Sequence, residues 1–173
     1  RYLFSKGESI MSIAIKYNEN GEFSNDINLE GRIEKYINNH FYPAKVISTL
    51  SQVYLLGGAI RDLIDAKKPK DLDFVVLGKD KEWILEVFDK FGIIPEYNRF
   101  GGFKINYNET VVDLWLSDDL FSAIQYNVDG LLFDVANKTL ISLTFGDFVT
   151  NGLKQVNQNN NIENGREKKL KKF

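Results

Sequence analysis

The sequence predicts an α/β (α+β) fold in which helices pack on one face of a small mixed β-sheet. A short apolar run, Val53–Leu56, ends at two glycines and is followed by a helical segment and a second strand-like run, Asp71–Leu77. Apolar residues recur at helical spacing over residues 81–91, and alternating patterns predict a hairpin over residues 103–116. Strands interleaved with amphipathic helices are typical of a sheet covered by a helical layer.

The composition is that of one globular domain. The chain has 173 residues, is 43% hydrophobic and 13% aromatic, and carries a formal net charge of -2, which gives no overall sign of nucleic-acid binding. It contains no cysteine, which excludes a disulfide framework and thiolate chemistry. No apolar run is long enough to span a membrane and no signal-peptide pattern is visible, so we expect a soluble, cytoplasmic protein without a membrane partner.

The first part of the chain leads into the first core strand. Residues 1–28 are expected to form an extension with a strand over Met11–Tyr17, and two helices are expected over Leu29–Asn38 and Ala44–Ser51. His40, the single histidine, stands between these helices without a visible metal-binding partner. We therefore interpret it as structural.

The two glycines after the first strand suggest a site for an anion. Gly57 and Gly58 permit positive φ angles and let a ligand approach the backbone, and a helix is expected to begin near Ala59. Backbone N–H groups at such a turn bind phosphate, and Arg61 adds a guanidinium in the first turn of the helix. The alternative is that the glycines form an ordinary turn.

Two carboxylates on the next strand suggest a metal site. In a strand, residues i and i+2 share a face, so Asp71 and Asp73 point the same way and Leu72 points into the core. Neighbouring carboxylates repel each other unless a cation lies between them, and Mg²⁺ binds one or two carboxylates together with substrate phosphates. Asp113, in the middle of a later apolar strand, is the candidate third ligand, unless it faces solvent from an edge strand.

The remaining elements follow from local patterns. The amphipathic helix over residues 81–91 presents its apolar face to the core, and the hairpin over residues 103–116 turns at Asn108–Glu109. Ser117–Asp119 is expected to cap a further helix, and Phe133–Val135 with Leu140–Ile141 is expected to form a closing hairpin.

The pattern Gly57-Gly58-x-x-Arg61-Asp62, followed by Asp71-x-Asp73, resembles the head domain of the poly(A) polymerase and CCA-adding tRNA nucleotidyltransferase family. The resemblance covers about residues 44–143 and includes the segment 126–134, where Asp129 stands in place of the family's asparagine. Residues 123–125 are Ala-Ile-Gln where the family has Arg-Arg-Asp. The family's neck and body domains, which select the nucleotide and bind tRNA, have no counterpart here, so the chain resembles a standalone head domain.

This resemblance implies a nucleotidyltransferase fold of the polymerase-β-like superfamily and a role for each motif residue. Asp71, Asp73 and Asp113 would hold two Mg²⁺ (or Mn²⁺) ions and serve as the catalytic carboxylates. The candidate contacts for a nucleoside triphosphate (NTP) are Gly57 and Gly58 for the β- and γ-phosphates, Arg61 for their charge, Asp62 for Arg61 or a ribose hydroxyl, and Lys70 and Lys104 as further phosphate contacts.

The end of the chain differs in composition from the rest. We assign residues 1–150 to the head domain and residues 151–173 to a polar linker and a basic tail. From Lys154 onward there are six basic and two acidic residues, a local charge of +4. Such a tail could bind an RNA backbone, although a solvated surface has the same composition.

Three functions remain open from the sequence. The first is transfer of a nucleoside monophosphate from an NTP to an RNA, most simply a tRNA-like 3′ end. The second is the same chemistry on a protein or small-molecule acceptor. The third is a non-catalytic module that binds a nucleotide or a partner chain. The three acidic residues favour an enzyme, whereas the missing arginines favour the module.

Overall fold

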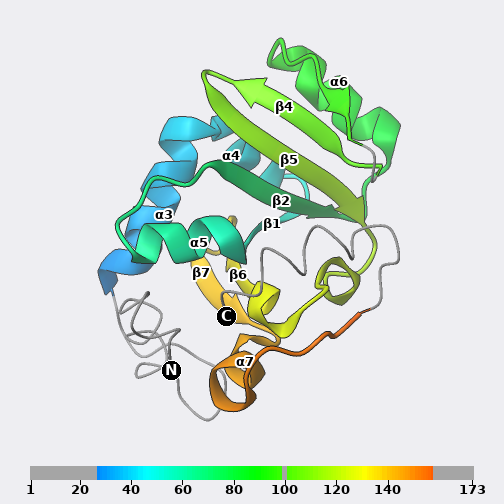
Figure 1. The fold of residues 1–173 in the computed structure, drawn as a ribbon. Coiled ribbons are helices and arrows are strands. Elements are labelled where there is room, and N and C mark those ends of the chain that lie inside the picture. Colours follow the sequence, from blue (N-terminus) through cyan, green and yellow to red (C-terminus); the bar gives the residue numbers. More distant parts are fainter. Residues whose placement is uncertain (1–26, 99–100, 158–173) are drawn as a thin grey trace.

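A seven-stranded mixed sheet runs through the computed structural model, which describes residues 27–98 and 101–157 (Figure 1). The strand order is β3-β4-β5-β2-β1-β6-β7, with β2 and β5 parallel and the other neighbours antiparallel. The strands are β1 (Gln52–Leu56), β2 (Asp71–Leu77), β3 (Glu96–Tyr97), β4 (Phe103–Tyr107), β5 (Thr110–Ser117), β6 (Leu131–Asp134) and β7 (Thr139–Ser142). The predicted fold class is confirmed.

The helices pack on one face of this sheet. They are α3 (Ile27–His40), α4 (Tyr42–Ser48), α5 (Gly57–Ile64), α6 (Lys81–Lys90) and α7 (Phe145–Asn151). Alternate residues of β2 (Leu72, Phe74 and Val76) are fully or almost fully buried against them in the main hydrophobic core. Burial of each such side chain contributes about 1.5–3 kcal/mol relative to exposure. Among the described residues, no helix is long and apolar enough to cross a membrane.

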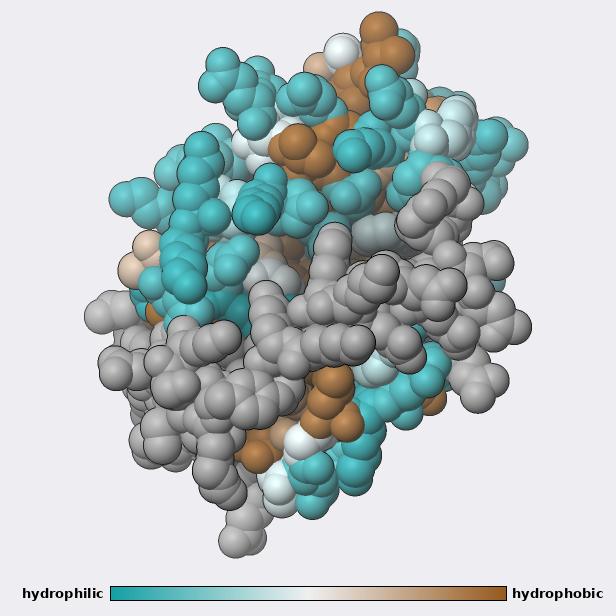
Figure 2. Space-filling view, viewed as in Figure 1, coloured by the Kyte–Doolittle hydropathy of each residue, from teal (hydrophilic) through white to brown (hydrophobic). Residues whose placement is uncertain are grey.

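The opposite face of the sheet has a smaller apolar cluster. Tyr54, Val75 and Leu132 are buried there, and Leu120 and Ala123 pack against them from the segment that follows β5. This segment contains a 3-10 helix, η1 (Phe121–Ala123). It therefore covers part of the face that the α-helices leave open. Figure 2 shows mainly hydrophilic residues on the surface of the coloured part of this view, with hydrophobic residues in separate patches.

Several boundaries differ from the sequence-based expectation. Helix α5 begins at Gly57 rather than near Ala59, and α4 spans residues 42–48 rather than 44–51 because Pro43 occupies its first turn. The helix expected to begin at a cap in Ser117–Asp119 is a single 3-10 turn that starts later, with Leu120 at its N-cap position, so that expectation is wrong in its boundary. Asp119 instead accepts hydrogen bonds from the N–H groups of Phe121 and Ser122. The strand expected over Met11–Tyr17 lies outside the described residues.

Asn127 fixes the C-terminal part of the described chain to the sheet. It is fully buried in a second 3-10 helix, η2 (Asn127–Gly130). Its Nδ2 donates to Asp147 Oδ2 (2.8 Å) and to the carbonyl of Gly152 (2.9 Å), and its Oδ1 accepts from the N–H of Lys154 (2.9 Å). Residues 152–157, assigned above to the linker, are thus hydrogen bonded to the folded domain, and residues 158–173 lie outside the described part.

We predict that Asn127→Ala lowers the free energy of unfolding by about 2 kcal/mol, because it removes three hydrogen bonds that a fully buried side chain makes. The expected fall in melting temperature is about 4–8 °C, measured by circular dichroism. Asn151→Ala is the matched control: its exposed side chain donates to the same Asp147 carboxylate, so little change is expected. Equal melting temperatures for both variants would contradict the role of Asn127.

Candidate active site

Three carboxylates meet on the face of the sheet opposite the helices. Asp71 and Asp73 alternate with Leu72 along β2, which confirms their predicted common face. Strand β5 lies parallel to β2 with Asp113 directly opposite Asp73. One carboxylate oxygen from each of Asp71, Asp73 and Asp113 lies within 4.8 Å of the others. Parallel pairing of two strands thus assembles a cluster from residues 40 positions apart in the chain.

The electrostatics of this cluster suit a cation. Burial, followed by the charge of Asp71, raises the pKa of Asp113 above its ordinary value. Lys104, opposite Asp113 on β4, and a hydrogen bond from the side chain of Asn98 act in the other direction. The net upward direction of the pKa means that burial, with a further contribution from repulsion by Asp71, disfavours the ionised form of Asp113. Oxygen ligands grouped in this way fit Mg²⁺ or Mn²⁺, which would relieve that repulsion.

A cavity of about 310 Å³ lies beside the carboxylates. Its described lining residues are Leu56, Gly57, Gly58, Arg61, Asp73, Val75, Trp115, Leu116, Ser117, Ser122, Ala123, Gln125 and Asp129. Asp73 belongs both to this lining and to the carboxylate cluster. A ligand in the cavity would therefore contact any ion held by the three carboxylates.

The two glycines lie at the start of α5, where N–H groups of the first turn have no partner within the helix. Neither residue adopts the positive φ angle that a glycine permits. The close approach of the Leu131 backbone explains why residue 57 is a glycine, because a Cβ there would lie 3.0 Å from the carbonyl oxygen of Leu131. A Cβ at Gly58 would have only Arg61 Nη2 nearby, at 3.9 Å, and would point into open space beside the cavity. A phosphate group would fit this space.

Arg61 is held at the wall of the cavity. Its Nη1 donates a 2.9 Å hydrogen bond to the carbonyl of Val128 in η2. The same nitrogen would lie 3.0 Å from a Cβ at Gly57, so the guanidinium lies directly beside the glycines. The guanidinium therefore places a positive charge in the cavity wall beside Gly57 and Gly58.

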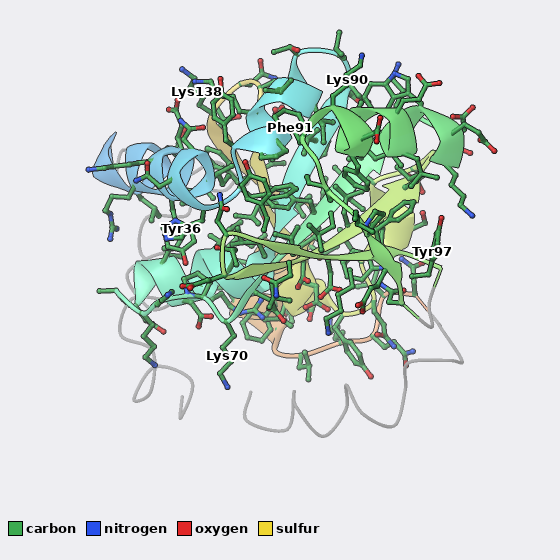
Figure 3. The ribbon with its side chains drawn as sticks, turned by 90° about the horizontal axis from the view of Figure 1, so that it is seen from above. Tyr36, Lys70, Lys90, Phe91, Tyr97 and Lys138 are labelled. Carbon is green, nitrogen blue, oxygen red and sulfur yellow. The ribbon has the colours of Figure 1, made fainter. Side chains whose placement is uncertain are left out.

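The other predicted contacts lie outside the cavity lining. Asp62 lies toward α3, where its charge adds to burial in raising the pKa of Tyr36. Lys104 is beside Asp113 on the neighbouring strand β4. Lys70 is exposed and extends away from α3 and α6, on the other side of the sheet (Figure 3). Lys70 directly precedes Asp71 in the chain, and Lys104 is paired with Asp113, so both lysines adjoin the carboxylate cluster without lining the cavity.

Sequence reasoning missed three side chains of the site. Trp115 lines the cavity and follows Asp113 by two residues in β5. Because alternate residues of a strand share a face, the sequence could have placed Trp115 on the same face as that carboxylate. Gln125 comes from the segment after η1; the sequence marked this position only as a departure from the Arg-Arg-Asp of the resembled family and gave it no role. Asn98 precedes β4; its side chain hydrogen bonds to Asp113, and its Oδ1 accepts from the N–H of Gly102 at 2.8 Å.

Gly57 and Gly58 should respond differently to the same substitution. Gly58→Ala is expected to leave the melting temperature unchanged but to weaken NTP binding by about tenfold, because the methyl group enters the phosphate space. Gly57→Ala is expected to lower the melting temperature, because its methyl group meets a backbone carbonyl. Calorimetric titration and thermal unfolding of both variants check this. Unchanged NTP affinity in Gly58→Ala would contradict the phosphate site.

Comparison with known proteins adds a fold but no family assignment. No family model and no curated protein matches this chain. Among solved structures, a CCA-adding enzyme in an apo form is similar to it at 19% identity and a TM-score of 0.56, covering 76% of this chain and 36% of that chain. A tRNA-processing enzyme with CTP is similar at 18% identity and a TM-score of 0.52, covering 66% and 35%.

A tRNA nucleotidyltransferase complexed with a primer tRNA and an incoming ATP analog is similar at 19% identity and a TM-score of 0.50, covering 62% of this chain and 36% of that chain. The chain spans only about a third of the length of these enzymes, 35–36%. At such low identity the likeness concerns the fold. This chain has a nucleotidyltransferase-like fold, as its sequence motifs predicted.

Proposed function

We propose that this protein transfers a nucleoside monophosphate from an NTP to an acceptor hydroxyl in a metal-dependent reaction. One observation carries the proposal: Asp71, Asp73 and Asp113 converge within 4.8 Å beside a cavity, and Asp73 lines that cavity together with Gly57, Gly58 and Arg61. A carboxylate cluster next to a phosphate site is the arrangement that phosphoryl-group transfer requires.

Each residue has a distinct role in this proposal. Gly57 and Gly58 admit the β- and γ-phosphates to the N–H groups of α5, and Arg61 balances their charge. Asp71, Asp73 and Asp113 would together hold two Mg²⁺ or Mn²⁺ ions. When bound, these ions would polarise the phosphate and favour an in-line displacement. Asp113 orients the acceptor hydroxyl and can accept its proton.

The reaction is balanced without any other reactant. The acceptor oxygen forms a bond to the α-phosphorus of the NTP, while the bond between that phosphorus and the oxygen bridging to the β-phosphate breaks. Pyrophosphate leaves, and the hydroxyl proton passes to a carboxylate or to water. The products are pyrophosphate and an acceptor that carries a nucleoside monophosphate.

For the acceptor we propose an RNA 3′ end of the tRNA type. The support comes from the fold, since one similar structure is described as a tRNA nucleotidyltransferase with a primer tRNA and an ATP analog. Because this chain spans about a third of such enzymes, we propose that it corresponds to their head domain and that a partner chain or further residues supply RNA recognition.

A protein or small-molecule acceptor is the second candidate. Among the described residues that line the cavity, Arg61 alone is basic, and the far end is formed by Trp115, Ala123 and Gln125. A cavity wall with two acidic side chains, Asp73 and Asp129, and a single basic one suits a protein or small-molecule acceptor better than an RNA backbone, which binds mainly through basic side chains.

The test is to incubate the protein with Mg²⁺ or Mn²⁺, each α-³²P-labelled NTP in turn, and either total RNA or a protein extract. Label on tRNA would support the RNA acceptor, and label on a protein would support the second candidate. Absence of label on any acceptor, together with no metal-dependent NTP binding, would leave a non-catalytic module as the remaining function.

A further inference from the structure

Gln125 carries a buried side-chain amide that makes no hydrogen bond within the part of the chain that the structure describes. Only 8% of its surface is exposed, and neither Oε1 nor Nε2 has a hydrogen-bond partner among the described residues. Leaving a buried polar group unpaired costs about 1–3 kcal/mol. The amide lines the cavity of the candidate active site. A ligand in that cavity is therefore placed to satisfy it.

The backbone holds Gln125 in place. Its carbonyl accepts hydrogen bonds from the N–H groups of Val156 (2.7 Å) and Asn157 (3.1 Å), and the next residue, Tyr126, pairs with Gln155 in an isolated bridge. Asn157 in turn donates from Nδ2 to the carbonyl of Ile124 at 2.7 Å. The backbone of Gln125 is thus fixed by hydrogen bonds on both sides, so its side chain starts from a defined point on the cavity wall.

The chemistry of an amide restricts what it can bind. It offers one acceptor and one donor group side by side, whereas a phosphate offers acceptors only and would leave Oε1 facing an anion. The edge of a nucleobase presents a donor and an acceptor next to each other, and glutamine pairs with such edges through two hydrogen bonds. The base edge therefore matches the amide better than the triphosphate does.

The neighbouring walls suit a flat, apolar ring. Trp115 and Val75 line the same cavity as Gln125. The indole of Trp115 lies against the backbone of Gly102, where an added Cβ would come within 2.6 Å of two of its ring atoms. The indole is thus held in position, and an aromatic ring is a surface on which a base can pack.

We propose that Gln125 recognises the edge of the NTP base, with Trp115 forming the apolar wall of the base site. This inference rests on the proposed function, because it assumes that the phosphates occupy the space beside Gly57, Gly58 and Arg61. It adds that the described domain carries its own means of choosing between bases.

The experiment measures binding without turnover. Calorimetric titrations with Mg²⁺ would use the α,β-methylene analogues of ATP, GTP, CTP and UTP, their 2′-deoxy forms, and tripolyphosphate as the phosphate-only probe. The variant is Gln125→Leu, which keeps the approximate size but removes both polar atoms. Gln52→Leu, at an exposed position of β1, is the matched control. Thermal unfolding checks that both variants are folded.

The wild-type protein is expected to prefer at least one base by about tenfold or more. Gln125→Leu should lose that preference, while its affinity for tripolyphosphate and the behaviour of Gln52→Leu remain unchanged. An unaltered base preference in Gln125→Leu overturns the inference. The inference also fails if Gln125→Leu loses the difference in affinity between the ribose and 2′-deoxyribose analogues but keeps the preference among bases. If neither tripolyphosphate nor any NTP analogue binds the wild-type protein, the proposed function fails as well, so the two failures are distinguishable.

Discussion

Replacing Asp73 by asparagine is expected to reduce nucleotidyl transfer by about a thousandfold or more while leaving the fold intact. Asp73 is the carboxylate shared by the cluster and the cavity, so its charge acts on both a bound ion and the nucleotide phosphates. Asparagine keeps the size of the side chain but removes the negative charge. Asp71→Asn is expected to have a similar effect, because it lies on the same face two residues away.

The measurement is the initial rate of label transfer, with circular dichroism to verify folding. Asp89→Asn is the matched control, because Asp89 is an exposed aspartate in α6. It should retain wild-type rates. Transfer by Asp73→Asn at a rate within a few-fold of wild type would show that the carboxylate cluster does not carry the reaction.

Substituting Asp113 by asparagine is expected to have opposite effects on activity and on the stability of the metal-free protein. Transfer should fall by about a hundredfold or more, because an asparagine cannot hold the metal or accept the proton in the same way. The metal-free protein should melt at a higher temperature, because the substitution removes a half-buried charge that repels Asp71. Stabilisation by Mg²⁺, about 2.7 kcal/mol at a hundredfold excess over Kd for an intact site, should be largely lost.

The pH dependence of stability follows from the direction in which the pKa of Asp113 is shifted. Burial and the charge of Asp71 raise the pKa of Asp113 in the folded state above the value of the unfolded chain, about 3.9. The folded state therefore binds the proton more tightly. This contribution to stability is complete below the unfolded pKa and is lost as the pH rises through the folded pKa.

Melting temperatures of the metal-free protein between about pH 3 and 7 would test this sign, with Asp113→Asn as the reference. The melting temperature of Asp113→Asn is expected to rise relative to that of the wild-type protein as the pH rises. If the variant is less stable than wild type throughout that range, the carboxylate of Asp113 is stabilised by its neighbours rather than repelled by them. Lys104 and Asn98 would then outweigh burial and Asp71.

Local patterns in the sequence were sufficient to predict most elements and the orientation of several site residues. The two-residue period of a strand put Asp71 and Asp73 on one face and Leu72 on the other, and the structure agrees. The hairpin over β4 and β5 and the amphipathic helix α6 were also predicted, because each depends on residues close together in the chain. The catalytic roles of the carboxylates stay predictions that the variants above test.

Tertiary structure alone decided how the pieces meet. The sequence singled out Asp113, but its position opposite Asp73 depends on β5 lying parallel beside β2, and strand periodicity does not encode which strands become neighbours. Gln125 reaches the cavity because the segment after β5 crosses the open face of the sheet and is fixed there by residues 155–157. Hydrogen bonds across such distances in sequence leave no local pattern. The sequence by itself therefore determined the chemistry of the site, and the packing of distant segments determined the cavity in which that chemistry would occur.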